Sequence, residues 1–144
     1  LYILVGTNNL VVQGSEDSFI AYYERLIDML REQLNPGVTI YIQSIPGVQE
    51  DVVASKPGLD NTRIATVNDL LANMALRKGC YYINIREALT NPADGSQIDD
   101  YATKDGVHFN AAGYHAWAEY LATHTVWYRR SVYSGENPYY IYGT

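Results

Sequence analysis

The 144-residue sequence has a single cysteine, Cys80, so no disulfide can form within the chain. One cysteine does not identify the compartment, and a secreted or cell-surface location stays compatible with the sequence. No apolar run is longer than a strand, which argues against a segment that spans a membrane. With 47% hydrophobic and 18% charged residues, the composition is typical of a globular domain.

Positive charge is also scarce. The chain carries 10 lysines and arginines against 16 aspartates and glutamates, a formal net charge of −6. Binding to a phosphate backbone needs a basic face, and the sequence contains no cluster of Lys and Arg that could supply one. We therefore expect no nucleic-acid partner.

Apolar and β-branched runs predict three strands, and apolar positions three or four residues apart predict three helices. The strands are expected at 1–5, 38–45 and 80–85, and the helices at about 15–34, at 62–78 and from 111 onward. This alternation favours a parallel sheet with helices on its faces, a three-layer α/β/α domain. We assign residues 1–124 to the domain and 125–144 to a tyrosine-rich C-terminal extension.

The loops after the predicted strands are expected at one edge of the sheet, where open α/β sheets bind their ligands. They begin at Gly6, Pro46 and Arg86. The connection over 46–61 is long, which makes it a candidate functional segment. The sequence therefore predicts a site built from these loops.

In the third loop, Asp105 precedes His108 by three residues across a glycine turn. A carboxylate that orients a histidine is the usual arrangement of a general base. The alternative is a polar Asp-Gly turn, with His108 at the entry of a helix that Asn110 caps. The spacing alone leaves both interpretations open.

The first loop reads "GTNNL". An asparagine amide just after a buried strand, such as Asn8, can donate a hydrogen bond to a developing oxyanion, and Gly6 lets the backbone turn closely. An ordinary Asx turn favours the same residue types. This segment is also ambiguous when taken alone.

Together and in this order, the two segments resemble the SGNH (GDSL-type) hydrolases. "GTNN" is similar to the third conserved block of that family, and "DGVHFNAAGY" is similar to its fifth. "VTIYIQSIP" looks like the central strand and the proline-bearing loop between them. The resemblance covers residues 1 to about 124 and implies a flavodoxin-like parallel sheet of the SGNH-hydrolase type.

The resemblance implies His108 as general base, Asp105 as its orienting partner and Asn8 as an oxyanion donor. It places Gly6, Thr7 and Asn9 against the substrate, although Asn9 stands where the family usually has Asp. It implies no metal and no organic cofactor. The expected substrate is a small acyl ester, with an acetylated carbohydrate favoured by the many aromatic residues.

The nucleophile block of the family, Gly-Asp-Ser, does not occur in these 144 residues. No serine lies in the strand-turn-helix setting of a nucleophile; those considered are Ser15, Ser44, Ser55, Ser96, Ser131 and Ser134. The sequence starts directly on an apolar strand without an initiator methionine. We therefore expect the serine upstream of Leu1. We also expect that segment, or another chain, to pair with the exposed edge of strand 1–5.

Two alternatives remain. The first is a non-catalytic binding or assembly module that keeps the scaffold and lacks the nucleophile. The second is an unrelated flavodoxin-like binding domain, which no glycine-rich phosphate loop supports.

The other candidate residues favour structural roles. His115 and Glu119 lie four residues apart, as a surface pair does. We expect His124 in the last turn of its helix, where the dipole favours a cation, and Cys80 in the core. Asp94, Asp99 and Asp100 form an acidic loop whose spacing matches no calcium loop.

Overall fold

Three short parallel strands form the sheet in the computed structural model, which describes residues 1–12 and 14–126. They are β1 (Tyr2–Ile3), β2 (Tyr41–Gln43) and β3 (Tyr81–Ile83), in the order β1-β2-β3. Tyr2 is paired with Tyr41, and Tyr41 is paired with Tyr81. β1 lies at one edge of the sheet.

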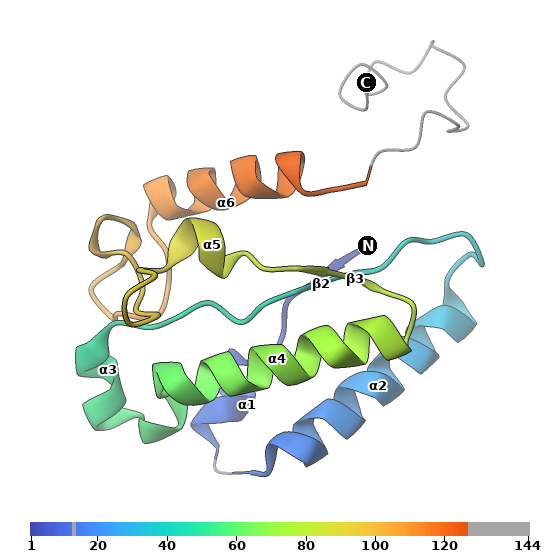
Figure 1. Cartoon of the computed structure of the whole chain (residues 1–144), viewed down its shortest axis with the longest axis horizontal. Coiled ribbons are helices and arrows are strands. Elements are labelled where there is room, and N and C mark those ends of the chain that lie inside the picture. Colours follow the sequence, from blue (N-terminus) through green and yellow to red (C-terminus); the bar gives the residue numbers. More distant parts are fainter. Residues whose placement is uncertain (13, 127–144) are drawn as a thin grey trace.

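Six α-helices and two 3₁₀ turns connect and cover the strands in the described part of the chain. They are α1 (Thr7–Val11), α2 (Glu16–Gln33), α3 (Glu50–Ser55), η1 (Pro57–Leu59), α4 (Asn61–Arg77), α5 (Arg86–Leu89), η2 (Asp99–Tyr101) and α6 (Ala111–Thr123). Figure 1 shows α6 on one side of the strands and α2 and α4 on the other.

The two longest helices begin at side-chain caps. Ser15 accepts a hydrogen bond from the backbone N–H of Ser18 (3.1 Å) at the start of α2, and Asp60 accepts one from Arg63 (2.9 Å) at the start of α4. Such caps satisfy amide groups that the helix itself leaves without partners. The predicted bounds of both helices are confirmed to within one or two residues.

The larger core cluster lies between the sheet and the pair α2 and α4. Alternate residues of the strands, such as Ile3 and Ile42, meet the apolar faces of both helices there. The fully buried members from these elements are Ile27, Ile42, Ile64, Val67, Leu71, Met74 and Ala75. Burial of these side chains is the main source of stability on this face.

The smaller core cluster covers the opposite face of the sheet, where Tyr41, Ile83 and Phe109 pack against α6. Trp117 of α6 donates a hydrogen bond from its indole nitrogen to Oε1 of Gln43 (2.7 Å). The rings of Tyr2, Tyr41 and Tyr81 stack across the three strands, with centroids 4.9 and 5.3 Å apart. The predicted α/β architecture with a parallel sheet is thereby confirmed.

Several local predictions were wrong. The segment that follows β1 is the helix α1 rather than a loop, and the loop predicted over 46–61 contains α3 and η1. The strands are shorter than predicted, because apolar residues continue beyond the paired positions. On α6, Tyr114 is exposed (53%) although its spacing predicted an inward position. Most of the predicted extension, 127–144, lies outside the described residues.

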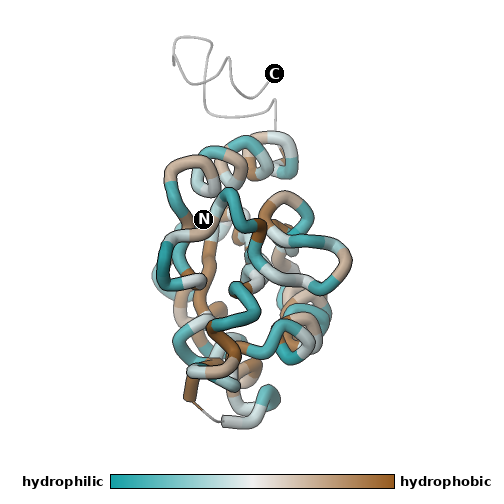
Figure 2. Tube along the Cα trace, turned by 90° about the vertical axis from the view of Figure 1, so that its left-hand side faces the viewer, coloured by the Kyte–Doolittle hydropathy of each residue, from teal (hydrophilic) through white to brown (hydrophobic). Residues whose placement is uncertain are grey.

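The carboxyl ends of the strands point toward α1, α3 and the loops after α5, on the left of Figure 1. Figure 2 views the molecule from that end and shows hydrophilic (teal) segments at the surface and hydrophobic (brown) segments behind them. Among the described helices, none combines the length and apolar character that crossing a membrane requires.

Candidate active site

Asp105 and His108 form a direct pair in the loop that precedes α6. Nδ1 of His108 lies 2.6 Å from Oδ2 of Asp105, and both side chains are solvent-exposed (73% and 50%). Nε2 of His108 has no hydrogen-bond partner within 1–12 and 14–126. An ionised carboxylate only accepts hydrogen bonds, so Nδ1 donates and Nε2 of the neutral ring keeps its lone pair. That is the tautomer a general base requires.

The second oxygen of Asp105 organises the turn itself. Oδ1 accepts hydrogen bonds from the backbone amides of His108 and Val107 (both 2.9 Å) and from the hydroxyl of Thr103 (2.8 Å). The amide of His108 contributes most, followed by its ring, and these bonds hold the pKa of Asp105 well below its ordinary value. Asp105 therefore stays ionised. Its Oδ2 orients the ring of His108, and its Oδ1 holds the turn.

The Asp105–His108 pair and the polar turn with a capped helix occur together in this segment. Asn110 caps α6 by accepting a hydrogen bond from the amide of Gly113 (3.1 Å), and Asp105 forms an Asx-type turn. The same turn points His108 outward and positions its ring on Oδ2 of Asp105. The turn is thus the means by which the pair is built.

Gly106 anchors the turn on α3. Its φ of +69° lies in the left-handed region, and its carbonyl accepts a hydrogen bond from the amide of Gln49 (2.9 Å). A Cβ at this position would lie 2.5 Å from Cγ2 of Val52 and 2.9 Å from Cβ of Gln49. Only glycine fits both the conformation and the contact.

We expect Gly106→Ala to destabilise the protein by about 1–3 kcal/mol, because left-handed backbone and a close contact act together. The free energy of unfolding from urea denaturation measures the change. Gly37→Ala is the matched control, since nothing lies within 4 Å of its added Cβ. Equal stabilities of the two variants would contradict this account of the turn.

Asn8 lies in α1, at the carboxyl end of β1. Gly6, with a φ of +131°, starts this helix, and a Cβ there would lie 2.6 Å from Cδ1 of Ile45 and 2.8 Å from Cζ of Phe19. Thr7 is half-buried, whereas Asn8 and Asn9 are exposed. The glycine therefore permits close packing of the backbone, and the two amide side chains face outward from the helix.

The structure brings Asp105 and His108 into contact, and no described hydrogen bond or cavity joins Asn8 to them. Leu10 of α1 and Val107 of the histidine loop both pack on the larger core cluster. α1 and the histidine loop are thus fixed to one core at the edge where the strands end. The roles of Asn8, Thr7, Asn9 and Gly6 toward a substrate remain predictions.

The described serines have structural partners. Ser15 and Ser18 bond to each other at the start of α2 (2.8 Å), and the hydroxyl of Ser55 donates to the carbonyl of Val52 (3.0 Å). Ser44 is fully buried and accepts a hydrogen bond from the amide of Arg86 (3.3 Å). Within the described ranges, none of them forms a hydrogen bond with His108.

The remaining candidates have structural contacts, and Cys80 is half-buried rather than fully buried. His115 and Glu119 form an exposed pair on α6 (3.4 Å). His124 ends the same helix, where its ring stacks on Tyr120. Cys80 packs on the larger core cluster, and burial raises the pKa of its thiol.

Sequence reasoning missed the residues that support the site from a distance. Thr103 bonds to both Asp105 and the carbonyl of His108, and the buried Gln97 reaches that carbonyl with its amide (3.3 Å). The polar residues around the turn gave no signal, because threonine and glutamine are ordinary in loops. Arg63, a residue of α4 that contacts α1, also gave no signal, because its partner Leu10 lies 53 residues away in the sequence.

Comparison with protein families finds that the profile of the GDSL-like lipase/acylhydrolase family matches residues 1–116. Comparison with curated protein sequences gives no match.

Solved structures with the same fold include a protein from Streptococcus pneumonia described provisionally as a platelet activating factor (TM-score 0.76, 23% identity). Others are a provisionally assigned acylhydrolase from Bacteroides fragilis (0.69, 16%) and a GDSL-like lipase from Bacteroides thetaiotaomicron (0.68, 17%). Each match covers 85% of this chain. The chain spans 57%, 58% and 59% of those structures, in the same order.

Proposed function

Because the chain belongs to the GDSL-like lipase/acylhydrolase family, we propose that it provides the base, its partner and an oxyanion donor of a serine esterase. The observation that carries this proposal is the pair Asp105–His108, with Nδ1 bonded and Nε2 open. The serine nucleophile is proposed to come from sequence upstream of Leu1. In support, the chain spans less than two thirds of each of the three solved structures.

In the proposed reaction, the serine hydroxyl attacks the carbonyl carbon of the ester while Nε2 of His108 accepts its proton. The resulting oxyanion receives a hydrogen bond from the amide of Asn8. When the carbonyl carbon–alkoxy oxygen bond breaks, the proton on Nε2 passes to the leaving alcohol. Water, deprotonated by the same nitrogen, then attacks the carbonyl carbon of the acyl-serine. The bond from that carbon to the serine oxygen breaks, the carboxylic acid leaves, and the proton on Nε2 returns to the serine.

The proposed substrate is a small acyl ester, with acetylated carbohydrate as the preferred class. An aromatic group begins one residue after His108: Phe109 contacts Trp117 edge to face, and Tyr114 stacks on Trp117 with centroids 5.9 Å apart. Tyr114 is 53% exposed. Exposed aromatic faces with polar tips suit a ligand that is both apolar and hydroxylated.

We further propose that a strand from the upstream sequence pairs with the outer edge of β1. β1 is the edge strand, and Leu1, Tyr2 and Val5 are 46%, 42% and 43% exposed. An apolar edge of this kind invites pairing with another strand. The same strand would bring the serine to the carboxyl ends of the strands, where the loop of His108 lies.

Both proposals can be tested by comparing two proteins. One is residues 1–144 alone, and the other also contains the sequence upstream of Leu1 and is here termed the extended polypeptide. We expect the extended polypeptide to hydrolyse p-nitrophenyl acetate and acetylated xylan and to react with a fluorophosphonate, a reagent for activated serines. Residues 1–144 alone should do neither and should self-associate through β1 in sedimentation velocity.

An extended polypeptide that is inactive and unlabelled would favour the non-catalytic alternative, a binding or assembly module. A monomeric preparation of residues 1–144 would contradict the expected self-association and with it the argument that the edge of β1 requires a partner strand. These outcomes are separate, because activity reports on the nucleophile and sedimentation reports on the edge.

A further inference from the structure

The short helix α1, which carries Asn8, is held at both ends. At its start, Gly6 packs against Ile45 and Phe19. At its end, the carbonyl of Leu10 accepts a hydrogen bond from the guanidinium of Arg63 (3.0 Å), a residue of α4. A helix of five residues has little stability of its own, so these contacts determine its position.

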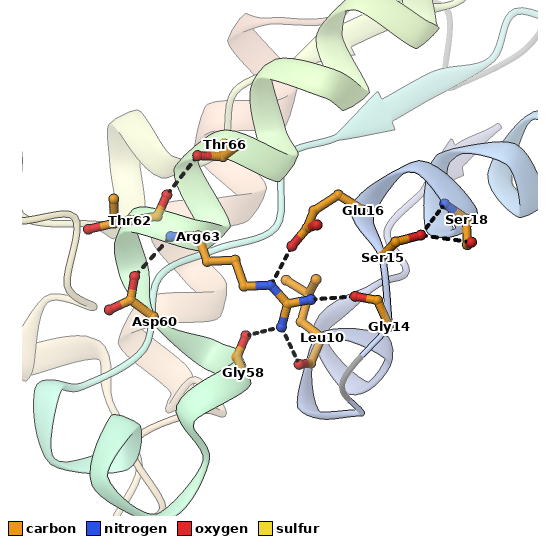
Figure 3. Close-up of polar contacts among 10 residues, drawn as sticks. All are labelled: Leu10, Gly14, Ser15, Glu16, Ser18, Gly58, Asp60, Thr62, Arg63 and Thr66. Carbon is orange, nitrogen blue, oxygen red and sulfur yellow. Dashed lines mark hydrogen bonds and ion pairs between the residues drawn. The ribbon is translucent and has the colours of Figure 1, made fainter.

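All three nitrogens of the Arg63 guanidinium donate hydrogen bonds, as Figure 3 shows. Nε donates to Oε1 of Glu16 (2.7 Å), one terminal nitrogen donates to the carbonyls of Leu10 and Gly58 (3.1 Å), and the other donates to the carbonyl of Gly14 (3.0 Å). One planar group thereby joins α1, η1, α4 and the start of α2. Only arginine offers donors in this fork geometry.

The surroundings of Arg63 fit this role. Its side chain is 22% exposed and that of Glu16 is 35% exposed. The hydrogen bond from Arg63 holds the pKa of Glu16 below its ordinary value. Gly58 allows the close approach of α1, since a Cβ there would lie 1.9 Å from the carbonyl oxygen of Leu10.

We infer that Arg63 is a positioning residue for the oxyanion donor: by fixing the carbonyl end of α1, it sets where the amide of Asn8 points. The inference rests on the proposed function, because Asn8 has a catalytic role only there. An oxyanion donor must lie within hydrogen-bond distance of the developing charge, so a displacement of about 1 Å is enough to weaken it.

The first test compares Arg63→Met with Arg77→Met in the extended polypeptide. Arg77 is also on α4 and pairs with Glu24 of α2 (2.6 Å), and it makes no described contact with α1. We expect Arg63→Met to lower kcat by about 10- to 100-fold while KM changes little, because the defect arises in the transition state. Arg77→Met should retain the wild-type kcat.

The second test repeats Arg63→Met in an Asn8→Ala background. If Arg63 acts through Asn8, the two substitutions are not additive, and Arg63→Met should then lower kcat by less than about twofold. A full additional loss in that background would show that Arg63 acts on catalysis by another route and would overturn the inference.

Amide hydrogen exchange tests the structural half without any catalysis. The amide of Leu10 donates to the carbonyl of Gly6 (3.0 Å), and its protection should fall at least about tenfold in Arg63→Met but not in Arg77→Met. Unchanged protection overturns the inference. If the wild type hydrolyses no ester but the exchange changes as expected, the proposed function fails while Arg63 still fixes α1.

Glu16→Gln is the milder variant should Arg63→Met not fold. It keeps an acceptor for Nε of Arg63 but removes the charge, so kcat and the protection of Leu10 should both fall by less than in Arg63→Met. Arg63→Lys, which loses the fork of donors, is measured beside it and should lower both quantities. Wild-type kcat and wild-type protection of Leu10 in both folded variants would overturn the inference.

Discussion

His108→Ala should lower kcat of the extended polypeptide by about 10²- to 10⁴-fold, the usual contribution of a general base. The ring of His108 is 73% exposed, and the turn is held by Asp105 through backbone amides that alanine retains. The free energy of unfolding should therefore change by no more than about 0.5 kcal/mol. Steady-state hydrolysis of p-nitrophenyl acetate and urea denaturation measure the two quantities.

His115→Ala is the matched control, because His115 also faces solvent beside a carboxylate, Glu119 at 3.4 Å. It should hydrolyse the ester at the wild-type rate. Activity in His108→Ala that equals activity in His115→Ala would refute the assignment of the base.

Asp105→Asn should lower kcat by up to about 10⁴-fold, by analogy with other triads, while leaving the turn in place. The asparagine oxygen can still accept from the amides of Val107 and His108. Its NH₂ group, however, replaces the oxygen that faces Nδ1 and would donate to it. The ring proton then moves to Nε2, where it blocks the uptake of the serine proton. Hydrolysis rates and unfolding measurements on the same preparations separate the two effects.

Asp94→Asn provides the control, since Asp94 accepts a hydrogen bond from the amide of Ser96 (2.8 Å) in a similar turn without a histidine.

Asp105→Ala, by contrast, should lose both activity and stability. Because the pKa of Asp105 is lowered by folding, its stabilising effect is full above the unfolded-state pKa of about 3.9 and is lost as the pH falls further. An Asp105→Asn protein with wild-type activity would remove Asp105 from the mechanism.

The order and type of the main elements follow from patterns that act locally. Apolar runs and helical spacing predicted β1, β2, β3, α2 and α4, because each of these elements buries one side against a common core. The same reasoning failed for α1 and α3. These helices have five and six residues, too few to show a period, and contacts with distant segments fix them.

The candidate site also has a part that is local in sequence, which could be predicted, and a part that depends on distant segments, which could not. Asp105 and His108 are close in sequence, so their spacing and the intervening glycine indicated the pair that the structure shows. Arg63 lies 53 residues from Leu10, and its contact depends on how α4 meets α1. No local pattern records such a contact. The substrate roles of Asn8 and its neighbours still depend on the experiments above.

The stacked rings of Tyr2, Tyr41 and Tyr81 also affect the register in which the three strands pair. Strands of two or three residues have few hydrogen bonds with which to resist sliding past one another. A shift of one strand by one residue would turn its tyrosine toward the opposite core and interrupt the stack. A shift of β1 along β2 would also move Gly6 away from Ile45, and α1 would then be displaced along the strand direction relative to the loop of His108. By favouring one register of the strands, the three stacked rings therefore also help to keep α1 in place.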